Sequence, residues 1–259
     1  MRFSNSIDEI LADNKSGSAE LLEKINKFLL NKFTKGLSIN KDLKRISKRF
    51  VEFQNISNYV KQISLLPESQ ILQYLIDFDA KSITKFELIY NNFSHLINET
   101  TTVVTLSNSK TITEVLKLAA NKKRNLHIII SESRPINEGT LMAEELALFG
   151  IRTTLITEAM IPKYVEESDF ALIGADKLLK DGSVINKIGS RLLAIVSAYF
   201  NKPYYVLADK TKQSRDDIFI QTSHNKKEIY LPKNKNLTVA ENLYFEKIES
   251  KLITEIFTD

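Results

Sequence analysis

From about residue 100 onward, short apolar segments alternate with amphipathic ones, and this alternation constrains the fold more than any other feature of the chain. The segments Leu126–Ile130 (LHIII) and Phe170–Ile173 (FALI) are apolar almost throughout, which is typical of strands buried on both faces. Strand alternating with helix implies right-handed crossovers and a parallel sheet between helices. We therefore predict an α/β fold with a Rossmann-like parallel sheet over residues 99–259. A Gly-x-Gly-x-x-Gly turn is absent, so the sequence carries no dinucleotide fingerprint.

The individual elements of this part follow from composition and period. The expected strands are β-branched or apolar runs bounded by polar residues; they are 101–106, 126–130, 152–156, 170–173 and 204–207, with a further short strand near Ile229. The expected helices repeat apolar residues at helical spacing; they are 111–121, 138–149, 161–167, 188–200 and 245–256. In the helix 188–200, the apolar residues Ile188, Leu192, Ile195 and Tyr199 are in phase.

Residues 1–98 have a different pattern and are predicted to form an N-terminal helical domain. Leu21, Leu22, Ile25, Phe28 and Leu29 repeat at the spacing of one helical face. Pro67 is expected to end a helix, and two further helices are expected over 68–78 and 83–97. No internal repeat is evident.

Composition narrows the class of protein. The chain has 259 residues, of which 43% are hydrophobic and 26% charged, as in soluble globular proteins. Its apolar runs fall short of the 18 or so residues that a membrane span requires, and the N-terminus lacks the features of a cleavable signal. We therefore expect a cytoplasmic protein without membrane association.

The absence of cysteine excludes disulfides, thiolate zinc sites and cysteine nucleophiles. The three histidines are scattered without metal-ligand spacing, so we expect neither a metal site nor a cofactor. The net charge of +4 is modest, with small basic clusters at 41–49 and 122–124. A nucleic-acid groove usually needs a denser basic stripe with interleaved aromatic residues, so the sequence gives nucleic-acid binding no support.

Polar residues follow every predicted strand, at the edge of the sheet where ligands of open α/β sheets bind. The most specific segment has Asp176 shortly after Gly174, with Asn186 and Lys187 expected at the start of the helix 188–200. Free backbone N–H groups and a lysine at a helix start form an anion site. A carboxylate beside it suits proton transfer on a phosphorylated substrate. The alternative is that Asp176 caps a turn and Asn186 caps the helix.

Several ordered motifs resemble one family. They are ESRP at 132–135, GADKLLKDGSVINKIGS at 174–190 and YYVLADKTK at 204–212. This order is similar to the family that joins the α, β and δ regulatory subunits of translation initiation factor 2B to two sugar-phosphate isomerases. Those isomerases act on methylthioribose-1-phosphate and ribose-1,5-bisphosphate. The resemblance covers residues 100–259 and, more weakly, the N-terminal helices.

The resemblance implies a set of site residues. In the isomerases an aspartate and a cysteine face the sugar phosphate, and the aspartate matches Asp176. Their substrate-binding Asn-Lys pair matches Asn186 and Lys187, and a lysine after the fifth strand matches Lys212. The cysteine belongs to a His-Cys-Asn-Ser motif. The matching residues here are Leu106, Ser107, Asn108 and Ser109.

Three parts of the isomerase pattern are missing. Ser107 replaces the thiol, and a hydroxyl gives up its proton far less readily than a thiol of pKa about 8.5. The Arg-Gly-Ala phosphate grip is replaced by Ser16, Gly17 and Ser18. An Arg-Pro-Thr stretch of the isomerases has no counterpart around 50–58. Because phosphate recognition relies on the bidentate guanidinium, these losses point away from the isomerase reaction.

The leading hypothesis is a non-catalytic member that resembles the regulatory subunits of initiation factor 2B and binds protein partners in translation initiation. The resemblance implies a homodimer formed through the α/β domain, with the α subunit of initiation factor 2 as a candidate partner. The remaining site residues are candidates for holding a sugar phosphate or a nucleotide. The alternative is a sugar-phosphate isomerase that uses Ser107 or Asp176 alone. A third possibility is a purely structural paralogue with an empty pocket.

Overall fold

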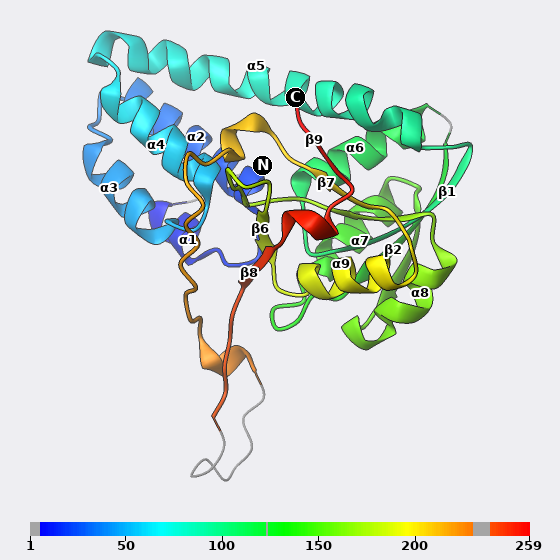
Figure 1. Cartoon of the computed structure of the whole chain (residues 1–259). Coiled ribbons are helices and arrows are strands. Elements are labelled where there is room, and N and C mark those ends of the chain that lie inside the picture. Colours follow the sequence, from blue (N-terminus) through cyan, green and yellow to red (C-terminus); the bar gives the residue numbers. More distant parts are fainter. Residues whose placement is uncertain (1–5, 123, 230–238) are drawn as a thin grey trace.

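The computed structural model describes residues 6–122, 124–229 and 239–259, and it places helices beside a parallel sheet (Figure 1). The first part of the chain is helical because apolar residues recur at helical spacing; its elements are α1 (Ile7–Ala12), α2 (Ser18–Thr34), α3 (Asn40–Arg49), α4 (Gln54–Leu65), α5 (Glu68–Phe93) and a 3-10 turn (Ser94–Leu96). A core of buried residues from α1 to α5, including Ile25, Ile46 and Ile56, holds these helices together. No helix in the described ranges is long and apolar enough to cross a membrane.

The parallel sheet runs in the order β3-β2-β1-β4-β7-β9, and each neighbouring pair is parallel. Its strands are β1 (Thr100–Leu106), β2 (Asn125–Ser131), β3 (Arg152–Ile156), β4 (Phe170–Ile173), β7 (Tyr204–Leu207) and β9 (Glu255–Phe257). The helices around it are α6 (Lys110–Asn121), α7 (Gly139–Leu148), α8 (Ile161–Glu167) and α9 (Ser190–Tyr199). The predicted Rossmann-like α/β fold that follows N-terminal helices is therefore confirmed.

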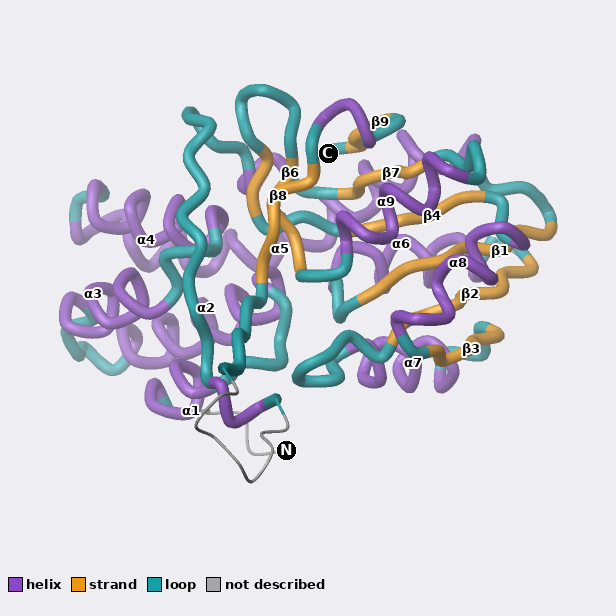
Figure 2. Tube along the Cα trace, turned by 60° about the horizontal axis from the view of Figure 1, so that its bottom comes forward, coloured by secondary structure: helices purple, strands orange, loops and turns teal. Residues whose placement is uncertain are grey.

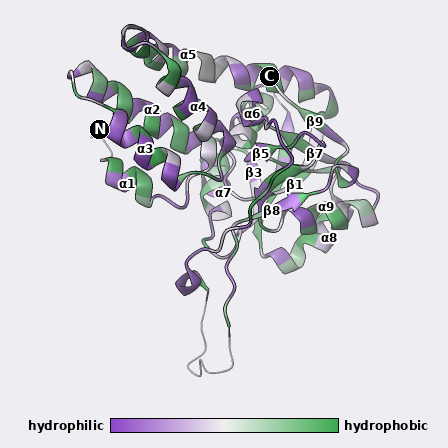
Figure 3. Cartoon of the chain, turned by 60° about the vertical axis from the view of Figure 1, so that its left-hand side comes forward, coloured by the Kyte–Doolittle hydropathy of each residue, from purple (hydrophilic) through white to green (hydrophobic). Residues whose placement is uncertain are grey.

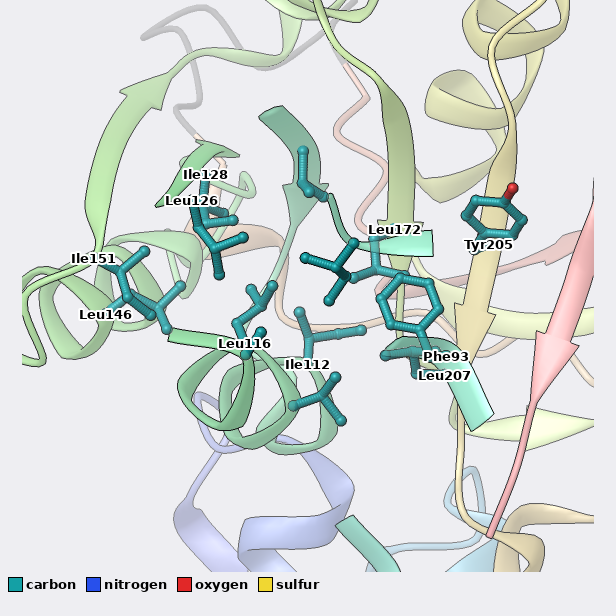
Figure 4. Close-up of a cluster of buried hydrophobic side chains, with 14 of the residues drawn as sticks. Phe93, Ile112, Leu116, Leu126, Ile128, Leu146, Ile151, Leu172, Tyr205 and Leu207 are labelled. Atoms are coloured by element: carbon teal, nitrogen blue, oxygen red, sulfur yellow. The ribbon is translucent and has the colours of Figure 1, made fainter. Parts of the chain in front are cut away.

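Each face of the sheet has its own hydrophobic core, because successive side chains of a buried strand point to opposite faces. Leu172 of β4 packs in the cluster with α5, α6 and α7, which Figure 4 shows. Its neighbours Ala171 and Ile173 pack in the other cluster, with α8 and α9. This two-sided burial explains why the strands are apolar almost throughout.

A second sheet was not predicted. It is antiparallel, in the order β5-β6-β8, and consists of β5 (Lys177–Leu178), β6 (Val184–Lys187) and β8 (Phe245–Ile248). The tube in Figure 2 shows it between the helical part and the parallel sheet. Asn186 and Lys187 therefore end a strand, and the expectation that they start a helix is wrong. The helix α9 begins at Ser190, after Gly189 has adopted a left-handed conformation (φ +99°).

Three other elements differ from the expectation. The predicted helix 245–256 is instead β8, a 3-10 turn (Ser250–Leu252) and β9. The buried residues of β8, Phe245 and Ile248, are three positions apart, so the sequence imitates a helical face. The predicted helices 68–78 and 83–97 form one helix, α5, because neither glycine nor proline interrupts residues 68–93. The strand expected near Ile229 is absent at Ile229 itself, which lies in a bend, and residues 230–238 lie outside the described ranges.

The helix α9 turns an unexpected face to the interior. Leu193 and Ala194 are buried against the sheet. The apolar residues that were in phase in the sequence are exposed, with exposed fractions of 44% for Leu192, 49% for Ile195 and 80% for Tyr199. This helix is consequently apolar on two sides.

Candidate functional site

The order of the strands creates a crevice between β1 and β4. From β1 the chain proceeds to β2 on one side, and from β4 it proceeds to β7 on the other. Ligands of open α/β sheets bind at such a switch point, beyond the carboxyl ends of the strands. Ser107 follows β1 directly and Asp176 follows β4 after two residues. The segments that follow β1 and β4 approach each other closely at Gly174. A Cβ atom at that position would lie 2.4 Å from the Ser109 hydroxyl oxygen, so a glycine is needed there.

A cavity opens at this point, with about 550 Å³ of empty space that is partly open to solvent. Four of the predicted residues, Ser107, Asn108, Asp176 and Lys187, line it together. The other walls come from the loop before α2, the turn between α3 and α4, and β8 with the segment that precedes it.

The centre of the polar wall is a buried carboxylate that the sequence did not single out. Glu138 accepts a hydrogen bond from the Ser107 hydroxyl at 3.0 Å, and it forms an ion pair with Lys187 at 2.9 Å. Glu138 and Lys187 are 3% and 5% exposed. Both contacts involve Oε1 of Glu138, and its other oxygen is buried with no side chain of the described residues hydrogen-bonded to it. Burial raises the pKa of Glu138, and the attraction of Lys187 opposes the rise.

Ser107 has an unusual backbone. Its φ of +67° lies in the left-handed region, which costs a residue with a side chain about 1 kcal/mol or more. The conformation is held by a hydrogen bond of 2.6 Å from the Ser107 N–H to the Ser133 hydroxyl. This sharp turn directs the Ser107 hydroxyl toward Glu138.

Two aromatic rings continue the wall beyond Lys187. The Lys187 ammonium lies 4.2 Å from the centre of the Tyr244 ring, a cation–π contact. The His224 ring stacks on Tyr244, with 3.7 Å between the ring centres and 4° between the ring planes. The imidazole Nε2 is also 3.5 Å from a carboxylate oxygen of Glu52. Burial, together with the positive charges of Lys187 and Arg49, lowers the pKa of His224.

Asp176 lies on the opposite side of the crevice from Glu138, at the end of β4. Burial raises its pKa, while Lys212, the Ser18 hydroxyl and Lys187 act in the other direction. The Asp176 backbone carbonyl accepts a hydrogen bond of 3.3 Å from the N–H of Gln54, which begins α4. The helical part of the chain therefore contacts the sheet directly at the site.

A helix start does face the cavity, but it belongs to α2 and not to α9. Ser16 and Gly17 line the cavity immediately before α2, and Gly17 caps that helix without a side-chain hydrogen bond. The hydroxyl of Ser18, the first residue of α2, is buried near Asp176 and lowers the pKa of that carboxyl. Free N–H groups at the start of a helix attract anions, so this end of the cavity suits a phosphate group.

Three predicted residues lie outside the cavity wall. Ser109 caps α6 by accepting a hydrogen bond from the Ile112 N–H at 3.4 Å. Asn186 is buried and donates to the Ser190 hydroxyl at 2.9 Å. Lys212 is buried, and its ammonium donates to the Ala175 carbonyl. Lys212 acts on the site only through its charge, which lowers the pKa of Asp176.

Sequence reasoning missed several wall residues, among them Glu138, Glu52, His224 and Tyr244. Glu138 follows the ESRP motif by two residues, and this position after β2 was the only available signal. His224 is one of the three scattered histidines, and its position in the sequence carries no signal for a site. A further carboxylate, Glu228, links the segments around Tyr244. It accepts hydrogen bonds from Asn14 at 3.0 Å, from Asn242 at 2.8 Å and from the Tyr244 hydroxyl. These contacts join segments that are more than 200 residues apart along the chain.

The fold is that of an α/β protein with a polar cavity at the switch point of its sheet. The chain belongs to the initiation factor 2 subunit family, whose family model matches residues 3–259. The resemblance to the initiation factor 2B regulatory subunits and their related isomerases is thus confirmed at the level of the family.

Both branches of that family are represented among similar proteins. A Pyrococcus horikoshii protein named as eIF-2B subunit 2-like is 36% identical over 119 residues, which is 46% of this chain and 43% of that protein. The ribose 1,5-bisphosphate isomerase of Methanocaldococcus jannaschii is 27% identical over 146 residues, which is 56% of this chain and 47% of the isomerase. The chain thus spans about half the length of the curated relatives it matches.

The fold is shared with a solved structure over nearly its whole length. The crystal structure of Pyrococcus horikoshii translation initiation factor eIF-2B superposes with a TM-score of 0.84 and 23% sequence identity. The superposition covers 97% of this chain and 93% of the other. At this identity the similarity concerns the fold alone.

Proposed function

We propose that the chain is a non-catalytic regulatory subunit of the initiation factor 2B type, with a cavity that binds a phosphorylated small molecule. The observation that carries the proposal is that Ser107 and Lys187 both contact the same oxygen of Glu138. The lysine that resembles the substrate-binding lysine of the isomerases is thereby neutralised within the protein. The position of the catalytic thiol holds a hydroxyl that is already engaged.

The ligand half of the proposal rests on the start of α2. The start of α2 has no side-chain cap, and Gly17 beside it lines the cavity, so this end is suited to a phosphate. The Ser16 N–H is already bound by the Asp13 carboxylate, so the N–H groups that remain are those after Gly17. Both a sugar phosphate and a nucleoside monophosphate carry a phosphate group. Isothermal titration calorimetry with both kinds of ligand tests this half, and the absence of any heat of binding overturns it.

An aldose–ketose isomerase is the second candidate. It is favoured by the similarity to a ribose 1,5-bisphosphate isomerase and by Asp176, whose raised pKa is typical of an acid or base in a buried site. The purified protein is incubated with ribose-1,5-bisphosphate or methylthioribose-1-phosphate, and formation of the ketose is followed. We expect no turnover. If the wild type converts either substrate and Asp176→Asn abolishes the conversion, the protein is an isomerase.

The partners are proposed on the same basis. We propose a homodimer formed through the α/β part, which the exposed apolar stripe Leu192, Ile195 and Tyr199 on α9 supports. The α subunit of initiation factor 2 is the candidate protein partner. A pull-down with that subunit tests the assignment, and a lack of retention at low salt contradicts it.

A further inference from the structure

One stretch of the helical part has a charge that the rest of the chain does not share. Residues 27–61 contain nine lysine and arginine residues but only two acidic residues, Asp42 and Glu52. Their net charge of +7 exceeds the +4 of the whole chain, so the remainder is net negative. Such an asymmetry within one chain indicates a surface for a charged partner.

The helix α3 places three of these nine cations on one exposed face. Leu43 and Ile46 are buried in the helical core. Lys41, Lys44 and Lys48, spaced by three and four residues, are exposed on the opposite side. The lysines span about 10 Å along the helix axis at 1.5 Å per residue. Figures 1 and 2 place α3 at the end of the molecule away from the parallel sheet, and Figure 3 shows hydrophilic and hydrophobic segments alternating along the neighbouring helices.

These three lysines are free to meet a partner, whereas Lys32 and Arg45 nearby are engaged in ion pairs. Lys32 pairs with the buried Asp42 at 2.5 Å, and Arg45 pairs with Asp8. Within the ranges that the structure describes, no carboxylate lies within 4.0 Å of the ammonium groups of Lys41, Lys44 and Lys48.

The stability of α3 accounts for only one of these three lysines. Lys48 lies in the last turn, where a positive charge is favourable to the helix dipole. Lys41 lies in the first turn, where a positive charge opposes the dipole, and the acidic residue of that turn, Asp42, is buried and paired with Lys32. Lys41 and Lys48 each lie one turn from Lys44, and like charges at this spacing destabilise a helix. Helix stability therefore leaves Lys41 and Lys44 unexplained.

We propose that the outer face of α3 binds the phosphate backbone of a nucleic acid, independently of base sequence. Each strand of a duplex offers a phosphate about every 3.4 Å along its axis, so a cationic stripe of this length meets several phosphates. The stripe itself contains no exposed aromatic or apolar side chain to stack on bases or to anchor in a protein pocket. The exposed apolar residues nearest in sequence, Leu37 and Val51, lie beyond the two ends of the helix. Backbone contacts alone therefore fit this face.

Fluorescence anisotropy with the full chain tests the proposal, using labelled RNA and DNA duplexes of about 20 base pairs at about 50 mM salt. The test variant is K41Q/K44Q/K48Q, since glutamine keeps the helix propensity of lysine. The matched control is K163Q/K227Q/K251Q, which removes the same charge from exposed positions elsewhere. Far-UV circular dichroism verifies that each variant keeps its helix content.

We expect the wild type and the control variant to bind both duplexes with similar affinity. We expect the α3 variant to bind at least about tenfold more weakly, and the slope of log K against log salt to fall by about 2 to 3, because each lost phosphate contact contributes about 0.9. A preference for RNA over DNA identifies RNA as the partner within the same proposal. Equal affinity of the two variants overturns the proposal, as does a wild type that binds neither duplex. Tighter binding to polyglutamate than to either duplex assigns the face to an acidic protein and overturns it as well.

Discussion

At the scale of single residues, Glu138 determines the charge that the cavity presents to a ligand. It engages the Ser107 hydroxyl and the Lys187 ammonium at once, in a place where both members of the ion pair are buried. A buried pair contributes little net stability, but the loss of one partner leaves a buried charge without compensation. Glu138 thus determines whether Lys187 is available to an anion.

Glu138→Gln should destabilise the protein by about 3 kcal/mol, because it leaves Lys187 buried and unpaired. Inorganic phosphate should restore more stability to this variant than to the wild type, because the phosphate can replace the lost carboxylate. Urea unfolding with and without phosphate measures both effects. The double variant E138Q/K187M serves as the control and should show no added response to phosphate. Equal stability of E138Q and the wild type would mean that the ion pair is not formed.

Asp176 leads to a prediction about pH. Because burial raises its pKa above the ordinary 3.8, the folded state binds more protons than the unfolded state between the two pKa values. The contribution of Asp176 to stability therefore decreases as pH rises through this interval. Asp176→Asn has no such titration, so its free energy of unfolding should increase relative to the wild type as pH rises from about 3.8. Urea unfolding at a series of pH values measures the difference, and a difference that shrinks with pH contradicts the raised pKa.

At the scale of elements, the helix α9 carries the clearest consequence. Its inner face is buried against the sheet, yet Leu192 and Ile195 are about half exposed. If the exposed face with Leu192 and Ile195 packs against a second copy of the chain, acidic residues placed there must separate the two copies, since a buried unpaired carboxylate is costly.

The variant L192E/I195E is therefore expected to have the mass of one chain, 29.6 kDa, in light scattering, whereas the wild type is expected to have twice that mass. L148E, at an apolar residue of α7 that is 84% exposed, is the matched control and should leave the dimer intact. A wild type that is monomeric at micromolar concentration removes the dimer from the proposed function.

The elements also show what sequence patterns can and cannot predict. Strands such as β2 and β4 were predicted because two-sided burial makes them apolar over their whole length. The antiparallel sheet was missed because β5 has two residues and β6 ends in the polar pair Asn186 and Lys187, and neither has a local period. In α9, the apolar spacing identified the helix correctly but not the face that is buried.

The same distinction holds for the site. Ser107 and Asp176 were found because each follows a strand end, and the topology of a parallel sheet brings such positions to one edge. Glu138, Tyr244 and His224 were not found, because their place in the wall depends on contacts between segments that are far apart in the chain. The roles of the predicted residues in binding or catalysis stay predictions.

At the scale of the whole molecule, α5 links the two parts. The residues near its start, such as Leu75, belong to the core of the helical part, and Phe93 at its end belongs to the core of the sheet. Phe93 packs edge-on against Phe170 and Phe257, with ring centres 5.7 Å and 5.3 Å apart. The division at residue 98 stays a prediction, and a helix shared between two cores should make them unfold together.

Phe93→Ala should destabilise both parts by about 3 to 5 kcal/mol, because it opens a cavity in a core to which α5 is anchored. Hydrogen exchange of amides in α2 and in β4 reports on the two cores separately. We expect the slowest amides of both to exchange faster by the same factor. Faster exchange in β4 alone would mean that the two parts unfold independently.

The helical part approaches the loop after β1 closely at Gly17. A Cβ atom built there would lie 2.6 Å from the carbonyl oxygen of Asn108, so any other residue has to move the start of α2 away from the loop after β1. Both Gly17 and Asn108 line the cavity. If the start of α2 moves away from the loop after β1, the cavity between them must widen. A ligand or partner that changes the width of the cavity therefore also changes the distance between the helices and the sheet.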